Sequence, residues 1–161
     1  MESYDLAQIC INGHVINSRA SKNPVRNKNF CEQCGAETIT SCKHCNTPIK
    51  GESSNPTIAE IRLGYKIPKF CDNCGNPFPW TQIKLKAASE LVHLSSDLSS
   101  EEKDDFNINI VDLVNESPNI PAAQIKVKKY LGKVGKDVAQ GIRDILVDLI
   151  SETVKRAIWN Q

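Results

Sequence analysis

Six of the seven cysteines of this chain occur as three Cys-x-x-Cys pairs, and no other feature restricts its fold as strongly. The pairs are Cys31/Cys34, Cys42/Cys45 and Cys71/Cys74. Two intervening residues allow both thiolates of a pair to reach one tetrahedral Zn²⁺ from a tight turn, at Zn–S distances of about 2.3 Å. Gly35 and Gly75 follow the second cysteine of their pairs and suit such turns, because glycine takes positive φ without steric cost. The pairs therefore predict structural zinc.

The state of these thiols depends on the cellular compartment. The chain opens with MESYDLAQICING, which lacks the basic start and the long apolar stretch of a signal peptide. No segment approaches the roughly 20 apolar residues of a membrane span. We therefore expect a cytoplasmic protein with no membrane attachment, in which spaced cysteine pairs bind metal more often than they form disulfides. A thioredoxin-like redox motif is the weaker alternative, since no pair follows a strand and opens a helix.

Three pairs do not complete two sites, because a closed structural zinc site has four ligands. The remaining cysteine, Cys10, lies four residues before His14, and the dipeptide Asn12-Gly13 between them is a turn signal. We therefore assign Cys10 and His14 as a fourth ligand pair. The full set predicts two zinc ions per chain, one held by four cysteines and one by three cysteines and a histidine.

Which pairs share an ion stays open. The residues between Cys34 and Cys42, GAETITS, favour an extended strand of roughly 20–25 Å, so the two pairs that flank it are not expected to share a metal. In a sequential scheme Cys10/His14 joins Cys31/Cys34, and Cys42/Cys45 joins Cys71/Cys74. In a crossed scheme Cys10/His14 joins Cys42/Cys45, and Cys31/Cys34 joins Cys71/Cys74. The similarity of FCEQCG and FCDNCG slightly favours the crossed scheme.

A family resemblance rests on the segments CINGHVI, FCEQCGAETITSCKHCNTPIKG and KFCDNCGNPFPWT, followed by helices. With these segments the chain resembles an uncharacterised family of bacterial proteins, a domain of unknown function with a zinc-ribbon-like start. The resemblance implies that Cys10 and His14 belong to the metal module. It implies no activity.

The two halves of the chain differ in pattern. We predict an α+β protein with a small two-zinc ribbon or knuckle module of short β-hairpins over residues 1–80 and an α-helical region over residues 81–161. Pro77 and Pro79 favour an extended path at the join. Apolar spacing predicts helices from Gln82, from the SSEEKDDF segment and from Ile120, and one long helix over residues 136–159.

Charge gives little support for a polyanionic partner. The chain has 20 lysines and arginines against 19 acidic residues, so it lacks the overall positive charge that is typical of nucleic-acid-binding proteins. The local candidate is the basic loop Arg19–Lys28, which also contains Lys22 and Arg26. A nucleic-acid-binding regulator that uses this loop is therefore the alternative hypothesis.

Catalysis is not expected. A catalytic zinc keeps one coordination position for water, whereas the predicted ligand set fills both ions. The HExxH motif and the zinc deaminase signature are absent. His93 is the remaining candidate base, but no nucleophile or acid is predicted beside it. We therefore predict a non-enzymatic protein-interaction or assembly component, with the zinc module as recognition surface.

The expected C-terminal helix has more apolar surface than one partner face requires. We predict that it acts as the oligomerisation or docking element, and that a second copy of the chain or another protein covers Leu146, Ile150, Val154 and Ala157. The simplest arrangement is a twofold homodimer.

Overall fold

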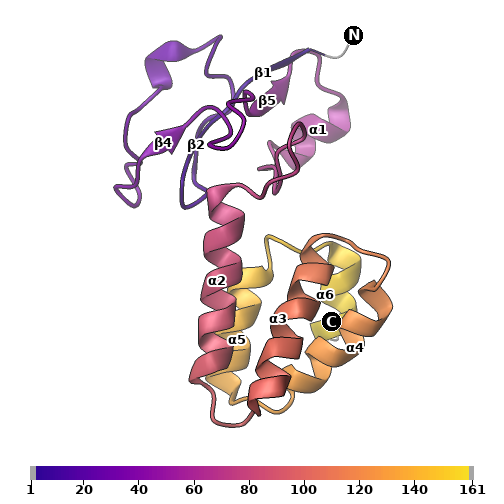
Figure 1. Cartoon of the computed structure of the whole chain (residues 1–161). Coiled ribbons are helices and arrows are strands. Elements are labelled where there is room, and N and C mark those ends of the chain that lie inside the picture. The colour runs from indigo at the N-terminus through magenta and orange to yellow at the C-terminus, as the bar shows by residue number, and fades with distance from the viewer. Residues whose placement is uncertain (1–2, 160–161) are drawn as a thin grey trace. The chain divides into compact units, whose positions relative to one another are not determined.

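The computed structural model describes residues 3–159, with short antiparallel strands followed by helices (Figure 1). This arrangement confirms the predicted α+β class. The chain forms two compact units, Met1–Gln82 and Ile83–Gln161. The boundary between them falls within helix α2, Pro79–Leu94.

The first unit contains two small antiparallel sheets. Strand β1 (Tyr4–Leu6) pairs with β5 (Lys50–Ser53). Strand β2 (Gln8–Cys10) lies between β3 (Val15–Asn17) and β4 (Thr38–Ile39). A 3-10 turn, η1 (Pro24–Arg26), and a six-residue helix, α1 (Ile58–Leu63), complete the unit. These elements are short, so turns and loops make up much of the unit.

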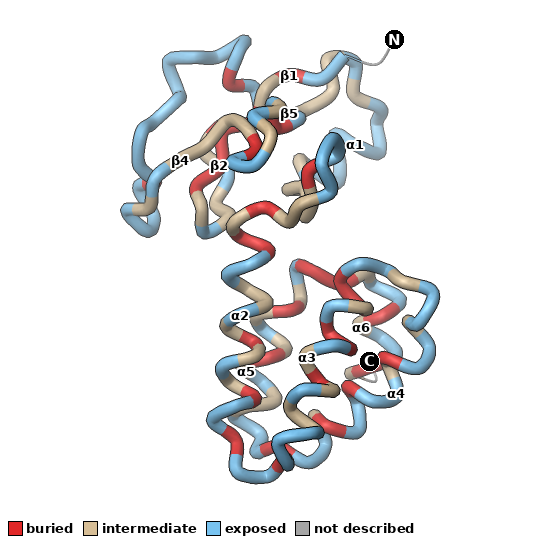
Figure 2. The backbone as a smooth tube through the Cα atoms, in the orientation of Figure 1, coloured by how far each residue is buried: buried red, intermediate tan, exposed pale blue. Residues whose placement is uncertain are grey.

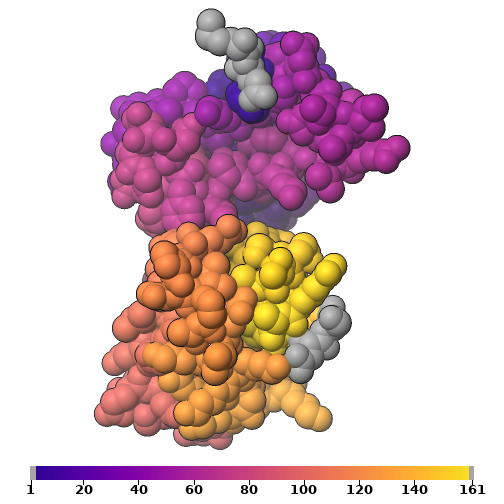
Figure 3. Space-filling view, turned by 90° about the vertical axis from the view of Figure 1, so that its right-hand side faces the viewer, coloured from indigo at the N-terminus to yellow at the C-terminus, as the bar shows by residue number. Residues whose placement is uncertain are grey.

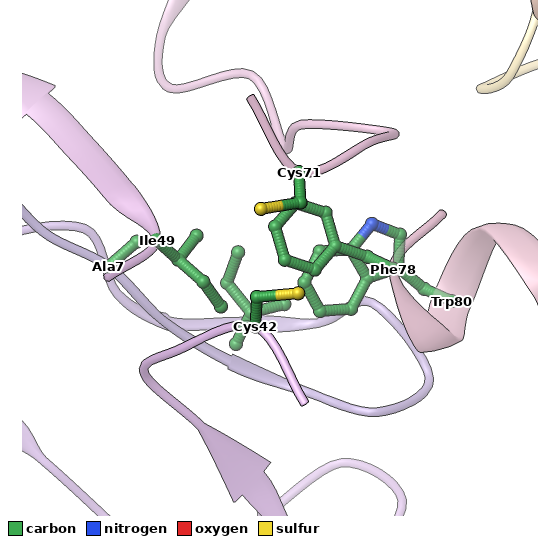
Figure 4. Packing of buried hydrophobic residues seen from close by; sticks show 7 residues of the cluster. Ala7, Cys42, Ile49, Cys71, Phe78 and Trp80 are labelled. Atoms are coloured by element: carbon green, nitrogen blue, oxygen red, sulfur yellow. The ribbon is translucent and has the colours of Figure 1, made fainter. Parts of the chain in front are cut away.

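A small apolar cluster fills the first unit, and it includes cysteines from two of the knuckles. Phe78 and Trp80 stack with ring centroids 4.7 Å apart, and Figure 4 shows their rings beside Cys42 and Cys71. The buried members of the cluster are Ala7, Ile9, Cys42, Ile49, Cys71, Phe78 and Trp80. The indole N–H of Trp80 donates to the Pro68 carbonyl at 2.8 Å, which satisfies its polar group. The cluster therefore packs the start of α2 against the two turns that contain Cys42 and Cys71.

The second unit is helical. After α2 come α3 (Ser100–Val114), α4 (Ile120–Leu131), α5 (Lys136–Leu146) and α6 (Glu152–Trp159). A capping box between Ser99 and Glu102 starts α3. Asp105 accepts hydrogen bonds from Lys126 and Tyr130 of α4, which fixes α3 and α4 side by side. Helix α4 also packs against α6, whose surface is yellow in Figure 3.

The single helix predicted over residues 136–159 is wrong. The structure breaks it between Leu146 and Glu152 into α5 and α6. In a continuous helix over residues 136–159, apolar residues would cover most of the circumference, and such a helix could not face all of them toward one core. The break allows both halves to bury their apolar residues: Ile142, Leu146, Leu149, Ile150, Val154 and Ile158 are buried (Figure 2).

The same burial removes the surface predicted for self-association. Leu146, Ile150 and Val154 are at most 5 % exposed within the single chain, and only Ala157 of the predicted set is exposed. In the single chain these three buried side chains are core residues of the helical unit. Of the face predicted for self-association, only Ala157 is therefore exposed in the single chain, and self-association itself stays a prediction.

Candidate metal centres

The three Cys-x-x-Cys pairs form three copies of one backbone turn. In each copy the N–H of the residue after the second cysteine donates to the carbonyl of the first cysteine, at 2.8–2.9 Å. The donors are Gly35, Asn46 and Gly75, and all three have positive φ, between 59° and 72°. Glycine or asparagine at this position is therefore a steric requirement of the turn. The turn directs both thiols of a pair to the same side.

Cys10 and His14 lie on a turn of their own at the end of β2. The Gly13 N–H donates to the Cys10 carbonyl at 2.8 Å, and the Cys10 N–H donates to the His14 carbonyl at 3.0 Å. Gly13 has φ of +93°, and a Cβ there would lie 3.0 Å from Cβ of Trp80. This glycine therefore allows both the turn and its contact with the apolar cluster.

The first candidate centre contains Cys10, His14, Cys31 and Cys34. His14 Nδ1 lies 3.5 Å from Sγ of both Cys10 and Cys31, and Sγ of Cys10 and Cys34 are 3.8 Å apart. Around a tetrahedral zinc, Zn–S of about 2.3 Å and Zn–N of about 2.05 Å place two sulfurs about 3.8 Å apart and a sulfur and nitrogen about 3.6 Å apart. The observed spacings match a tetrahedral metal site and are far too long for disulfides.

The second candidate centre contains Cys42, Cys45, Cys71 and Cys74. Sγ of Cys42 lies 3.8 Å from that of Cys74, and Sγ of Cys45 lies 3.6 Å from that of Cys71. These are again the edges of a tetrahedron that a four-thiolate site requires. The structure therefore brings all eight predicted ligands together as two sets of four, and each set can hold one metal ion.

The crossed pairing that the sequence favoured is wrong, and the sequential scheme is the one the structure contains. The register of β2 and β4 explains the difference. The two strands are antiparallel, with Cys10 opposite Thr38 and Ile9 opposite Ile39. Residues before Thr38, including the 31–34 knuckle, therefore lie at the Cys10 end of β2. Residues after Ile39, including Cys42, lie toward its opposite end.

Hydrogen bonds to Cys34 and Cys45 favour the thiolate forms that bind metal. The backbone N–H of Ala36 lowers the pKa of Cys34 to about 6, and the side chain of Thr47 lowers the pKa of Cys45 to about 6. Burial, in contrast, raises the pKa of Cys10. A bound dication would offset that cost, because it stabilises the deprotonated thiol.

Two asparagines contribute to the centres in a way that the sequence did not reveal. Asn12 Nδ2 donates to Sγ of Cys34, and Asn76 Nδ2 donates to Sγ of Cys74, both at 3.4 Å. The Asn12-Gly13 dipeptide predicted a turn, but nothing in it indicated a side-chain contact with a separate knuckle. Donors of this kind orient ligands and tune the basicity of the sulfur.

The remaining predicted functional residues lie away from the centres. His93 is exposed on α2, where its Nδ1 lies 2.8 Å from the Ser89 carbonyl oxygen. In the basic loop, Arg19 pairs with Glu52 at 2.6 Å and Lys28 pairs with Glu32. Two of the four cations of that loop are therefore neutralised within the chain.

Over residues 3–159, no helix combines the length and the apolar character needed to cross a membrane.

A family model described as "Uncharacterized protein conserved in bacteria (DUF2321)" matches residues 3–158, which is nearly the whole chain. Neither the curated proteins nor the solved structures contain a significant match.

Proposed function

Because the chain belongs to this uncharacterised bacterial family, we propose its function from its own geometry: it is a two-zinc protein that acts through binding to another protein. The observation that supports this proposal most is the pair of four-ligand sets at tetrahedral spacing. In this function the ions are structural, and the first unit presents a rigid recognition surface built around them.

Zinc is the metal that the donor sets favour. Both sets consist of thiol sulfurs, with one imidazole nitrogen in the first, and such soft tetrahedral donors select zinc over hard cations such as Mg²⁺ and Ca²⁺. Iron is the competing occupant of a four-thiolate site. The histidine nitrogen and the match to a tetrahedron of zinc dimensions support zinc at the first centre.

The ligand count supports a non-catalytic role. A catalytic zinc has three protein ligands and an open position for water or substrate, whereas each set here supplies four ligands. Bound zinc would instead supply folding free energy, of about 10–16 kcal/mol for a structural site. The first unit has few large apolar side chains in its core cluster, so this contribution is the main source of its rigidity.

Nucleic-acid binding is the less supported alternative. Arg19 and Lys28 of the basic loop already pair with carboxylates. A second lysine-rich segment covers residues 125–136, and its Lys126 and Lys133 pair with Asp105 and Glu102. A phosphate contact would have to break these ion pairs. The chain therefore offers few free cations in either segment.

Metal analysis of protein purified without added chelator tests the proposal. We expect two zinc ions per chain, with cobalt substitution giving the visible spectrum of tetrahedral thiolate coordination. One ion per chain, or iron in place of zinc, would contradict it. Salt-dependent binding of DNA or RNA, lost in Lys22→Ala/Arg26→Ala, would establish the alternative instead.

A further inference from the structure

A groove of about 540 Å³ lies in the first unit, apart from both metal centres. Strands β1 and β5 form one wall, through Tyr4 and Lys50, and α1 forms the other, through Ile61 and Leu63. The segment around Tyr65 closes the groove. Its volume is in the range of pockets that bind ligands or inserted side chains. Figure 1 shows α1 close to the β1–β5 pair.

Helix α1 exposes its large apolar side chains instead of burying them. Ile58, Ile61 and Leu63 are 72 %, 66 % and 69 % exposed, and no residue of the helix is buried. A helix of six residues is far below the length that is stable alone in water, and it normally depends on burying an apolar face. The capping box between Thr57 and Glu60 holds its start, but its apolar residues have no cover within the described chain.

Among the described residues, the charges that line the groove leave one free cation, Lys66. The carboxylate of Glu52 accepts from the Ser18 hydroxyl and from Arg19 Nε, both at 2.6 Å, and the carboxylate of Glu60 closes the capping box. Both carboxylates that line the groove are therefore committed. Lys66, also in the lining, has no carboxylate or other polar partner among residues 3–159. The groove consequently favours a ligand that carries negative charge.

Strand addition is not the mode of binding that this groove offers. The Glu52 N–H on the outer side of β5 already donates to the Ser18 carbonyl at 2.9 Å. The Lys50 carbonyl accepts the Tyr65 hydroxyl at 2.6 Å. Since these backbone groups of β5 are occupied, a partner would bind through its side chains and not as an added strand.

We infer that the groove between α1 and β5 binds an acidic amphipathic segment of a partner protein. Its apolar side chains pack against Ile61, Leu63 and Tyr4, and its carboxylates face Lys66. The inference rests on the proposed interaction function and names its site and the chemistry of the partner.

The test uses zinc-loaded full-length protein and two fluorescein-labelled synthetic helical peptides, measured by fluorescence anisotropy. Both peptides carry leucines at i, i+3, i+4 and i+7; one has glutamates at the flanking positions and the other has lysines. The acidic peptide is expected to bind at least about tenfold more tightly. The double variant Ile61→Ser/Leu63→Ser should weaken its binding about tenfold or more, because burial of these side chains provides the attraction. Ile125→Ser, which replaces an exposed isoleucine on α4, is the matched control and should leave binding unchanged.

A charge reversal makes the test reciprocal. Lys66→Glu should shift the preference from the acidic peptide toward the lysine peptide. Equal binding of both peptides, unchanged affinity in Ile61→Ser/Leu63→Ser, or no binding at millimolar concentration would overturn the inference. Light scattering that shows a dimer abolished in Ile61→Ser/Leu63→Ser would assign the groove to a second copy and also overturn it. Zinc content, measured on the same samples, separates these outcomes from failure of the two-zinc proposal.

Discussion

Two double variants distinguish the sequential pairing of the ligands from the crossed pairing. In the structure His14 and Cys34 belong to one centre, whereas Cys34 and Cys74 belong to different centres. His14→Ala/Cys34→Ser therefore removes two ligands from the first centre and none from the second. Cys34→Ser/Cys74→Ser removes one ligand from each. Under crossed pairing, His14→Ala/Cys34→Ser would remove one ligand from each centre, and Cys34→Ser/Cys74→Ser would remove two ligands from one centre.

The size of the effect follows from the ligand count. A structural zinc contributes about 10–16 kcal/mol through four ligands, so each ligand accounts for about 2.5–4 kcal/mol, or about 10²–10³ in affinity. A centre with two of four ligands left should lose its ion altogether. A centre with three left should release its ion to a chelator that an intact centre resists.

The assay is zinc content after dialysis against a competing chelator. We expect one retained zinc per chain in His14→Ala/Cys34→Ser and none in Cys34→Ser/Cys74→Ser. The wild type, which should retain two, and His93→Ala, which changes an exposed histidine outside the centres, are the controls. The opposite result, none in the first variant and one in the second, would refute the sequential assignment and the strand register on which it depends.

Four further outcomes are expected. Removal of both metals by a strong chelator should abolish the fixed structure of the first unit while far-UV circular dichroism retains the helical signal of the second; loss of both signals together would contradict this. Gly51→Ala should cost about 2 kcal/mol or more in urea unfolding, because its Cβ would lie 2.2 Å from the Ser18 carbonyl oxygen; a neutral effect would show that β5 can shift. Leu146→Ala should cost about 2–5 kcal/mol without changing the oligomeric state, since Leu146 is 1 % exposed; an oligomer that dissociates in this variant would support the dimer predicted from the sequence instead. The hydrogen bond from Lys126 lowers the pKa of Asp105 in the folded protein. The ionised Asp105 side chain should therefore stabilise the fold above its unfolded pKa of about 3.9, and this stabilisation should be lost as the pH falls through the lower folded pKa. A difference in unfolding free energy between the wild type and Asp105→Asn that persists at the lowest pH would argue against this.

The candidate metal ligands of this protein could be predicted from sequence because ligand type and turn geometry are local properties. A Cys-x-x-Cys pair and the residue that follows it determine one turn, whatever surrounds them. Gly35 and Gly75 indicated that turn, and Cys10 with His14 could be added by counting ligands. The α+β class was also predictable, since knuckle spacing and helical periodicity occupy different parts of the chain.

Which turns share a metal is a tertiary property. The sequence similarity of FCEQCG and FCDNCG favoured the crossed scheme, but similar turns can be placed anywhere that the chain between them allows. The antiparallel register of Cys10 with Thr38 placed the first two pairs at the same end of β2. That register depends on hydrogen bonds between segments about 30 residues apart, which no local pattern encodes.

The C-terminal helices and the groove depended on tertiary structure for the same reason. The periodicity of residues 136–159 is compatible with one amphipathic helix. The break between α5 and α6 is favoured only by the tertiary structure, because it allows Leu146 and Val154 to be buried in the same core. Ile61 and Leu63 show the reverse case, because apolar side chains in a short helix predict burial and the fold leaves them exposed. Sequence alone thus determined which groups can bind metal and which residues are apolar, because these are properties of single side chains and short turns. Only the tertiary structure decided which of them meet and which remain open to a partner, because free energy of burial depends on the neighbours that the fold provides.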